Sequence, residues 1–208
     1  MLGGSTKKRT SNTYIVFERF NTKRKSLIAA VIFSSVIVAI PTIASAHVGV
    51  QMRGNTLIAG QSSRIYLSLG HGCTYKGVQY GTQVFSTVVP STAGKPTPEF
   101  HQGFKVTVVP STQVDANNVP LSYTVTWTAR SSYWTIDPYT FYDFGLKVTW
   151  DKTPQKISFL TTQTCYAPGA SGIKKPLYLK WIQTDGTTPA ATDDTEFGPA
   201  PSVTTVAG

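Results

Sequence analysis

A histidine that follows a triplet of small residues offers the most distinctive chemistry in this chain. The triplet Ala44-Ser45-Ala46 ends an apolar run, and His47 comes directly after it. Signal peptidases cut after triplets of this kind. If the cut falls after Ala46, His47 becomes the first residue. Its free α-amine and its imidazole could then close a chelate ring on one metal ion.

Residues 1–46 have the features of a secretory signal peptide. A basic stretch that includes Lys23-Arg24-Lys25 precedes the apolar segment 27–43. The basic stretch is long, so an uncleaved membrane anchor is the alternative, although Pro41 near the end of the apolar segment favours cleavage. No later segment approaches the ~20 apolar residues that span a bilayer. We therefore expect a protein of the periplasm or the cell exterior, with membrane contact only through an uncleaved leader.

The charge pattern excludes several classes of function. Much of the net charge of +9 lies in the leader, and the longest basic run after residue 46 is Lys174-Lys175. Nothing in that part lines up cations as a nucleic-acid groove requires, so we expect no nucleic-acid partner. The sequence also lacks a phosphate-binding loop, a dinucleotide fingerprint and the residue order of a serine hydrolase.

The chain has two cysteines, Cys73 and Cys165. Because an exported chain meets oxidising conditions, we expect them to form a disulfide. Such a bond would close a loop of about 92 residues and stabilise the fold by about 4–5 kcal/mol. A pair of copper-binding thiolates is the alternative, although neither cysteine belongs to a Cys-x-x-Cys motif.

Apolar and polar residues alternate along most of the chain after His47, which is typical of β-strands. Turn residues separate these runs, and no window shows the apolar stripe of a helix. We expect an all-β fold, a single antiparallel β-sandwich of immunoglobulin or cupredoxin type, over residues 47–183. Residues 184–208 are expected to form an irregular tail that packs on or near it. The expected strands are 65–69, 84–89, 104–109, 123–127, 146–150, 157–161 and 177–181.

The two remaining histidines lie beside expected strands. His71 is flanked by Gly70 and Gly72, which let backbone approach closely, so it could be a second metal ligand or simply cap a loop. His101 precedes the strand expected at 104–109, and we expect its side chain to be exposed.

Several short motifs occur together in a recognisable order. They are Ala46-His47-Val48-Gly49-Val50, His71-Gly72-Cys73, Asp143-Phe144-Gly145 within 141–146, Gln163-Thr164-Cys165, and Trp181-Ile182 followed by Pro199-Ala200-Pro201. In this set and order the chain resembles the YcnI-like copper-binding domain family.

The resemblance implies a β-sandwich whose N-terminal histidine, here His47, binds Cu(II) through its amine and ring nitrogen. It also implies a carboxylate ligand and a tryptophan near the metal, here Trp181. The chain departs from the family at two places. It has Trp181-Ile182-Gln183 where relatives have Trp-Ile-Glu, and it has Gly103-Phe104 where they have Gly-Trp. The carboxylate therefore stays open among Asp143, Glu99 and Asp137, and the His71 imidazole could replace it.

Each assignment has a plain structural alternative. Trp181 shares a strand face with Leu177 and Leu179, so core packing alone would explain it, and Asp143 could simply end a strand.

Three functions follow from these residues. The first is copper buffering or delivery, with the copper ion and other copper-trafficking proteins as partners. The second is a copper-dependent oxidase or monooxygenase, with His71 as second imidazole and Tyr139 or Tyr142 docking a polysaccharide. The third is a structural sandwich that binds no metal.

Overall fold

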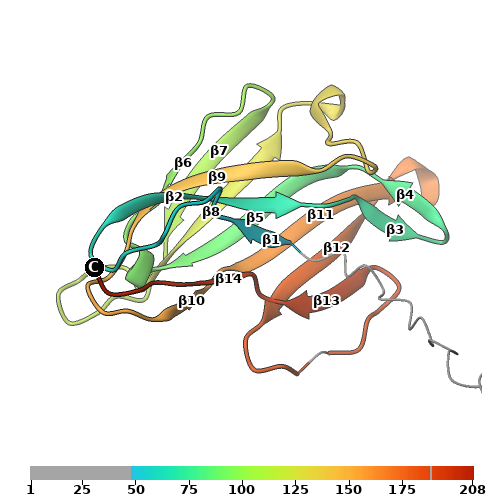
Figure 1. The fold of residues 1–208 in the computed structure, drawn as a ribbon. Helices are drawn as coiled ribbons and strands as arrows, with labels where there is room; N and C mark the ends of the chain where they lie inside the picture. Colours follow the sequence, from blue (N-terminus) through green and yellow to red (C-terminus); the bar gives the residue numbers. More distant parts are fainter. Residues whose placement is uncertain (1–47, 188) are drawn as a thin grey trace, which may run out of the picture. The chain divides into compact units, whose positions relative to one another are not determined.

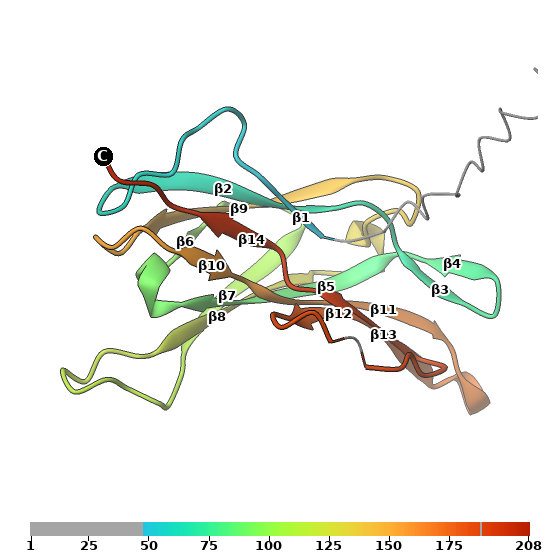
Figure 2. The ribbon, with the colours of Figure 1, turned by 60° about the horizontal axis from the view of Figure 1, so that its bottom comes forward.

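Long strands with alternating buried residues build two sheets that face each other (Figures 1 and 2). The computed structural model describes residues 48–187 and 189–208. One sheet has the strand order β1-β2-β9-β6, and the other has the order β13-β12-β11-β5-β8-β7. Two smaller sheets, β3-β4 and β10-β14, complete the architecture.

The strands are β1 (Gly49–Gln51), β2 (Ser62–Leu69), β3 (Cys73–Tyr75), β4 (Val78–Tyr80), β5 (Thr82–Pro90), β6 (Thr97–Pro98), β7 (Phe104–Pro110), β8 (Ser122–Ala129), β9 (Tyr142–Thr149), β10 (Lys156–Ser158), β11 (Leu160–Pro168), β12 (Lys174–Gln183), β13 (Thr195–Pro199) and β14 (Ser202–Thr204). Three 3-10 helices, η1 (Ser91–Ala93), η2 (Ser132–Trp134) and η3 (Ala170–Gly172), join some of them. Within the described ranges no helix has the length and hydropathy of a membrane span.

Strand register places one face of the β1-β2-β9-β6 sheet inward and the other outward. Leu67 pairs with Phe144 across β2 and β9, and both side chains are buried. The next pair along, Ser68 and Asp143, points to the opposite face because side chains alternate along a strand. This opposite face is called the outer face below.

The disulfide expected from the sequence is confirmed. Cys73 and Cys165 are bonded, and both are buried. The bond ties the β3–β4 hairpin to β11 in the large sheet. The alternative of two copper-binding thiolates is wrong, because both sulfur atoms are used in the bond.

The all-β sandwich is also confirmed, with two differences in detail. The strand expected at 157–161 is two strands, β10 and β11, because Phe159 lies between them and its N–H donates to the Pro201 carbonyl. The tail expected to be irregular contains β13, which pairs in parallel with β12, and β14, which pairs with β10. These two strands therefore complete the sheets.

Candidate functional site

His47 lies outside the described residues, and the described chain begins at the next residue. Val48 is 3% exposed and belongs to the core. Strand β1 then begins at Gly49 and pairs with β2 at the edge of the four-stranded sheet. The start of β1 is therefore the part of the structure closest in sequence to the proposed ligand.

A register row connects the start of β1 with Asp143. Gly49 pairs with Ser68, and Ser68 pairs with Asp143 on its other side. Residues paired directly across antiparallel strands share one face of the sheet. Asp143 thus lies on the outer face, two strands away from Gly49. The structure places this carboxylate on the same sheet face as Gly49, with β2 between their two strands.

Asp143 has one oxygen engaged and one without a partner. Arg53 Nη2 donates to Oδ2 at 2.8 Å, and the Asp143 side chain is only 18% exposed. Its Oδ1 atom is buried and accepts no hydrogen bond from any described residue. A buried carboxylate oxygen without a donor is costly. Asp143 therefore fits the role of a metal-binding carboxylate, with Oδ1 as the available atom.

Arg53 is held from two sides. Its guanidinium carbon lies 3.5 Å from the centre of the Tyr66 ring, which is a cation–π contact. The hydrogen bond to Asp143 is the main reason why the pKa of Arg53 is raised further. Stacking and pairing together fix the guanidinium over the outer face and orient the Asp143 carboxylate.

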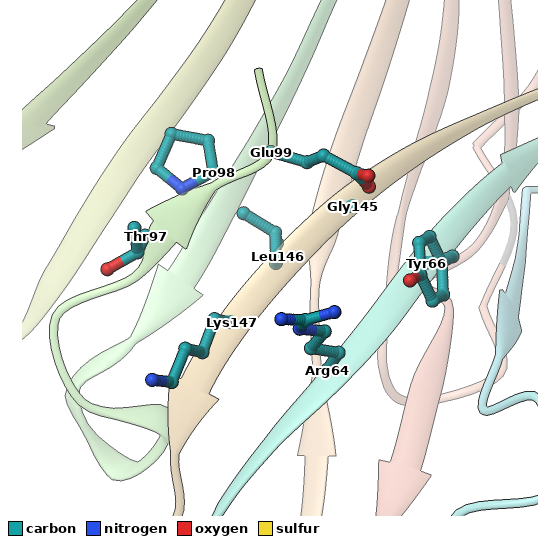
Figure 3. A pocket seen from close by; sticks show the side chains of 8 residues that line it. All are labelled: Arg64, Tyr66, Thr97, Pro98, Glu99, Gly145, Leu146 and Lys147. Atoms are coloured by element: carbon teal, nitrogen blue, oxygen red, sulfur yellow. The ribbon is translucent and has the colours of Figure 1, made fainter. Parts of the chain in front are cut away.

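A second carboxylate lies on the same face, in a cavity of about 260 Å³ (Figure 3). The Glu99 side chain covers Gly145, where a Cβ atom would come within 2.1 Å of Oε2. Glycine at this strand position therefore makes room for Glu99. The cations Arg64 and Lys147, paired across β2 and β9, line the same cavity. Glu99, like Asp143, lies on the sheet face that carries the row from Gly49.

The other residues singled out from the sequence lie elsewhere. His71 bonds through Nδ1 to the Gly72 carbonyl, and its own carbonyl accepts from Gln163 Nε2 at 2.8 Å. Trp181 is buried in the core between the sheets. Asp137 is exposed in the β8–β9 connection, where Oδ1 accepts from the Tyr139 N–H. In the part of the chain that is described, no three His, Cys, Asp or Glu side chains gather as a metal site.

The comparisons with known proteins support the fold. No protein-family model matches the chain, and no curated protein matches it. A crystal structure of an uncharacterized protein from Nocardia farcinica, which has an immunoglobulin-like fold, matches with a TM-score of 0.51. The two sequences are 19% identical, and the match covers 77% of this chain and 99% of the other. The chain therefore has an immunoglobulin-like fold.

His101, which was expected to be exposed, is partly buried in an aromatic cluster. Its Nδ1 atom lies 2.9 Å from the hydroxyl of Tyr142, and the rings of Phe104 and Phe144 contact it edge-on. Burial lowers the pKa of His101, and the negative charge of Glu99 opposes this only in part. Burial likewise raises the pKa of Tyr142. The sequence around His101 does not predict its contact with Tyr142, because the two residues are 41 positions apart.

The lowered pKa of His101 predicts a loss of stability in mild acid. The folded protein takes up this proton less readily than the unfolded chain, whose histidine titrates near 6.5. The free energy of unfolding should therefore fall as the pH drops from 6.5 through the lower folded pKa. Urea unfolding at pH 7.5 and pH 5.5 measures this difference.

The matched variants are His101→Gln and His71→Gln. His101→Gln removes the titrating ring, so the difference in unfolding free energy between the two pH values should shrink. His71→Gln, outside the aromatic cluster, should keep it. An equal pH dependence in the wild type and His101→Gln would contradict the assignment.

Proposed function

We propose that the exported chain binds Cu(II) through the α-amine and imidazole of His47, with Asp143 as the carboxylate ligand. We further propose that it buffers copper, or delivers it to a copper-trafficking protein, in the periplasm or outside the cell. The observation that carries this proposal is the register row Gly49–Ser68–Asp143. In this row Asp143, whose Oδ1 has no partner among the described residues, shares a sheet face with Gly49 at the start of β1.

The ligand chemistry favours copper over zinc. An α-amine has a pKa of about 7.7–8.0, so removing its proton at neutral pH costs only about 1 kcal/mol. Copper heads the affinity series of divalent metals and accepts nitrogen and oxygen ligands in a tetragonal arrangement. Zinc prefers tetrahedral sites with thiolate or several imidazole ligands. Both cysteines here are bonded to each other, so they supply no thiolate.

At the proposed site Arg53 would orient the Asp143 carboxylate, and Asp143 would bind the metal. Arg53 engages Oδ2, which leaves Oδ1 as the oxygen that can reach a metal. The bidentate geometry of a guanidinium with both oxygens would have blocked this role. The hydrogen bond from Arg53 thus orients the carboxylate while one oxygen stays available.

The test uses the exported protein after processing by the cell. Mass spectrometry should show His47 as the first residue, and calorimetry should show binding of one equivalent of Cu(II). One extra residue ahead of His47 removes the free amine from the histidine, so it should weaken binding at least tenfold. An electron paramagnetic resonance spectrum of that variant should show a changed nitrogen hyperfine pattern, because the amine and the imidazole no longer belong to the same residue.

The matched carboxylate variants are Asp143→Asn and Asp137→Asn. The first removes the proposed ligand and should weaken Cu(II) binding about tenfold, a typical effect of losing one supporting group at a metal. The second changes an exposed carboxylate in the β8–β9 connection and should leave Cu(II) binding unchanged. A processed protein that starts at another residue, or tight binding that survives the extension, would overturn the proposal.

A further inference from the structure

The exposed aromatic side chains of the described residues gather in two connections of the fold. One connection joins β6 to β7, and the other joins β8 to β9. Single exposed apolar residues are common on protein surfaces, but a group confined to one region indicates a binding surface. The five side chains are Phe100, Tyr133, Trp134, Tyr139 and Phe141.

The two connections are fixed to each other. The N–H of Arg130 donates to the Gly103 carbonyl at 2.9 Å, and its Nε donates to the Gln102 carbonyl at 3.2 Å. The Trp134 ring lies directly on Gly103, where a Cβ atom would come within 2.4 Å of Cε3. Any larger residue at 103 would push the indole away. Part of the indole thus packs against Gly103, and 38% of Trp134 stays exposed.

A cavity of about 400 Å³ opens between these connections. Its volume falls in the range of roughly 300–1,000 Å³ that small-molecule sites occupy. Aromatic rings of Phe104, Tyr133 and Trp134 line it together with the polar groups of Asp137 and Thr140. Tyr133 and Trp134 meet edge to face, with ring centres 5.3 Å apart at 86°. The cavity therefore offers aromatic faces beside hydrogen-bonding groups.

The charges of the residues that line the cavity indicate which class of ligand it can bind. Asp137 is its one carboxylate, and none of the described residues that line it is Lys or Arg. Phosphate groups, nucleic acid and anionic lipid need cations, which this cavity does not supply. Asp137 Oδ1 already accepts the Tyr139 N–H, so the carboxylate has a second oxygen for a hydroxyl donor. The lining suits an uncharged ligand that carries hydroxyl groups.

We propose that this cavity binds a sugar ring of a neutral oligosaccharide. A pyranose has an apolar face of C–H groups that can stack on Trp134, whose ring face is electron-rich. Its hydroxyl groups can donate to Asp137 and exchange hydrogen bonds with Thr140. This site is separate from the proposed copper site and does not depend on it, because Asp143, the carboxylate proposed above to bind copper, does not line the cavity.

The four tryptophans of the chain allow a direct test. Trp127, Trp150 and Trp181 are buried, so Trp134 is the tryptophan that a quencher in solution can reach. In the full exported protein, acrylamide should quench Trp134 fluorescence, and saturating cellohexaose or N-acetylchitohexaose, both uncharged, should at least halve that quenching. Calorimetry with the same two oligosaccharides gives the affinity directly.

Three variants separate the cavity from the exposed group as a whole. Trp134→Ala should lower the affinity at least tenfold, and Trp134→Phe should restore most of it because a ring is kept. Tyr139→Ala should change the affinity less than twofold, because Tyr139 is exposed but does not line the cavity. Circular dichroism checks that each variant keeps its sheet content.

Three results would overturn the proposal. The first is the absence of binding by both oligosaccharides in calorimetry and quenching. The second is protection of Trp134 by choline or by phosphatidylcholine vesicles but not by sugar, which would indicate a cation or membrane site. The third is an equal loss of affinity in Tyr139→Ala and Trp134→Ala, which would indicate a broad contact surface.

Discussion

Removal of the Cys73–Cys165 bond should lower the free energy of unfolding by about 4–5 kcal/mol. The two cysteines are 92 positions apart, so the bond strongly restricts the unfolded chain. It also anchors the short β3–β4 hairpin, which has few pairing partners of its own, to β11. The double variant Cys73→Ala/Cys165→Ala, unfolded in urea beside the wild type, measures the loss.

The slope of the unfolding transition provides an internal check. Without the bond the unfolded chain is less compact and exposes more surface, so the dependence on urea should steepen. Wild-type protein unfolded with a reductant should approach the values of the double variant. A loss below about 2 kcal/mol would mean that the bond constrains the unfolded chain far less than its loop length implies.

The sequence predicts the long strands well because their alternation is local. Ile65, Leu67 and Leu69 lie on one buried face of β2, and the expected strand at 177–181 lies within β12. Strands β1, β3, β4 and β6 have two or three residues, too few to show a period. Strand β13 contains glycine and proline and exists because β12 offers an edge for parallel pairing.

The candidate site depends on how the strands pair, which no local sequence pattern predicts. Asp143 stands out in the sequence as the first residue of the motif Asp143-Phe144-Gly145, but its partner Arg53 is 90 positions away. The row from Gly49 through Ser68 to Asp143 likewise appears only after three strands pair. The sequence leaves three candidates for the copper-binding carboxylate. The structure favours Asp143 and Glu99, which share the outer face, over Asp137, which lies in a loop.

Replacement of Phe144 by alanine should lower the free energy of unfolding by about 3–5 kcal/mol, the usual cost of truncating a buried phenylalanine. Phe144 is fully buried, and its ring stacks on Phe85 at 4.3 Å with nearly parallel planes. It also contacts Trp127 at 5.0 Å and the His101 ring at 5.7 Å. Urea unfolding of Phe144→Ala beside the wild type measures the loss.

The same variant should change the titration of His101, because the Phe144 ring contributes to the burial that lowers its pKa. With that ring removed, the pKa of His101 should rise toward its ordinary value, and a proton NMR titration of the imidazole measures it. Val109→Ala, on the exposed side of β7, is the control and should change neither quantity appreciably. Asp143 precedes Phe144 but faces the opposite side of the sheet, so Phe144→Ala spares the carboxylate proposed to bind copper. A loss of stability with an unchanged His101 pKa would show that groups other than Phe144 account for the burial of the imidazole.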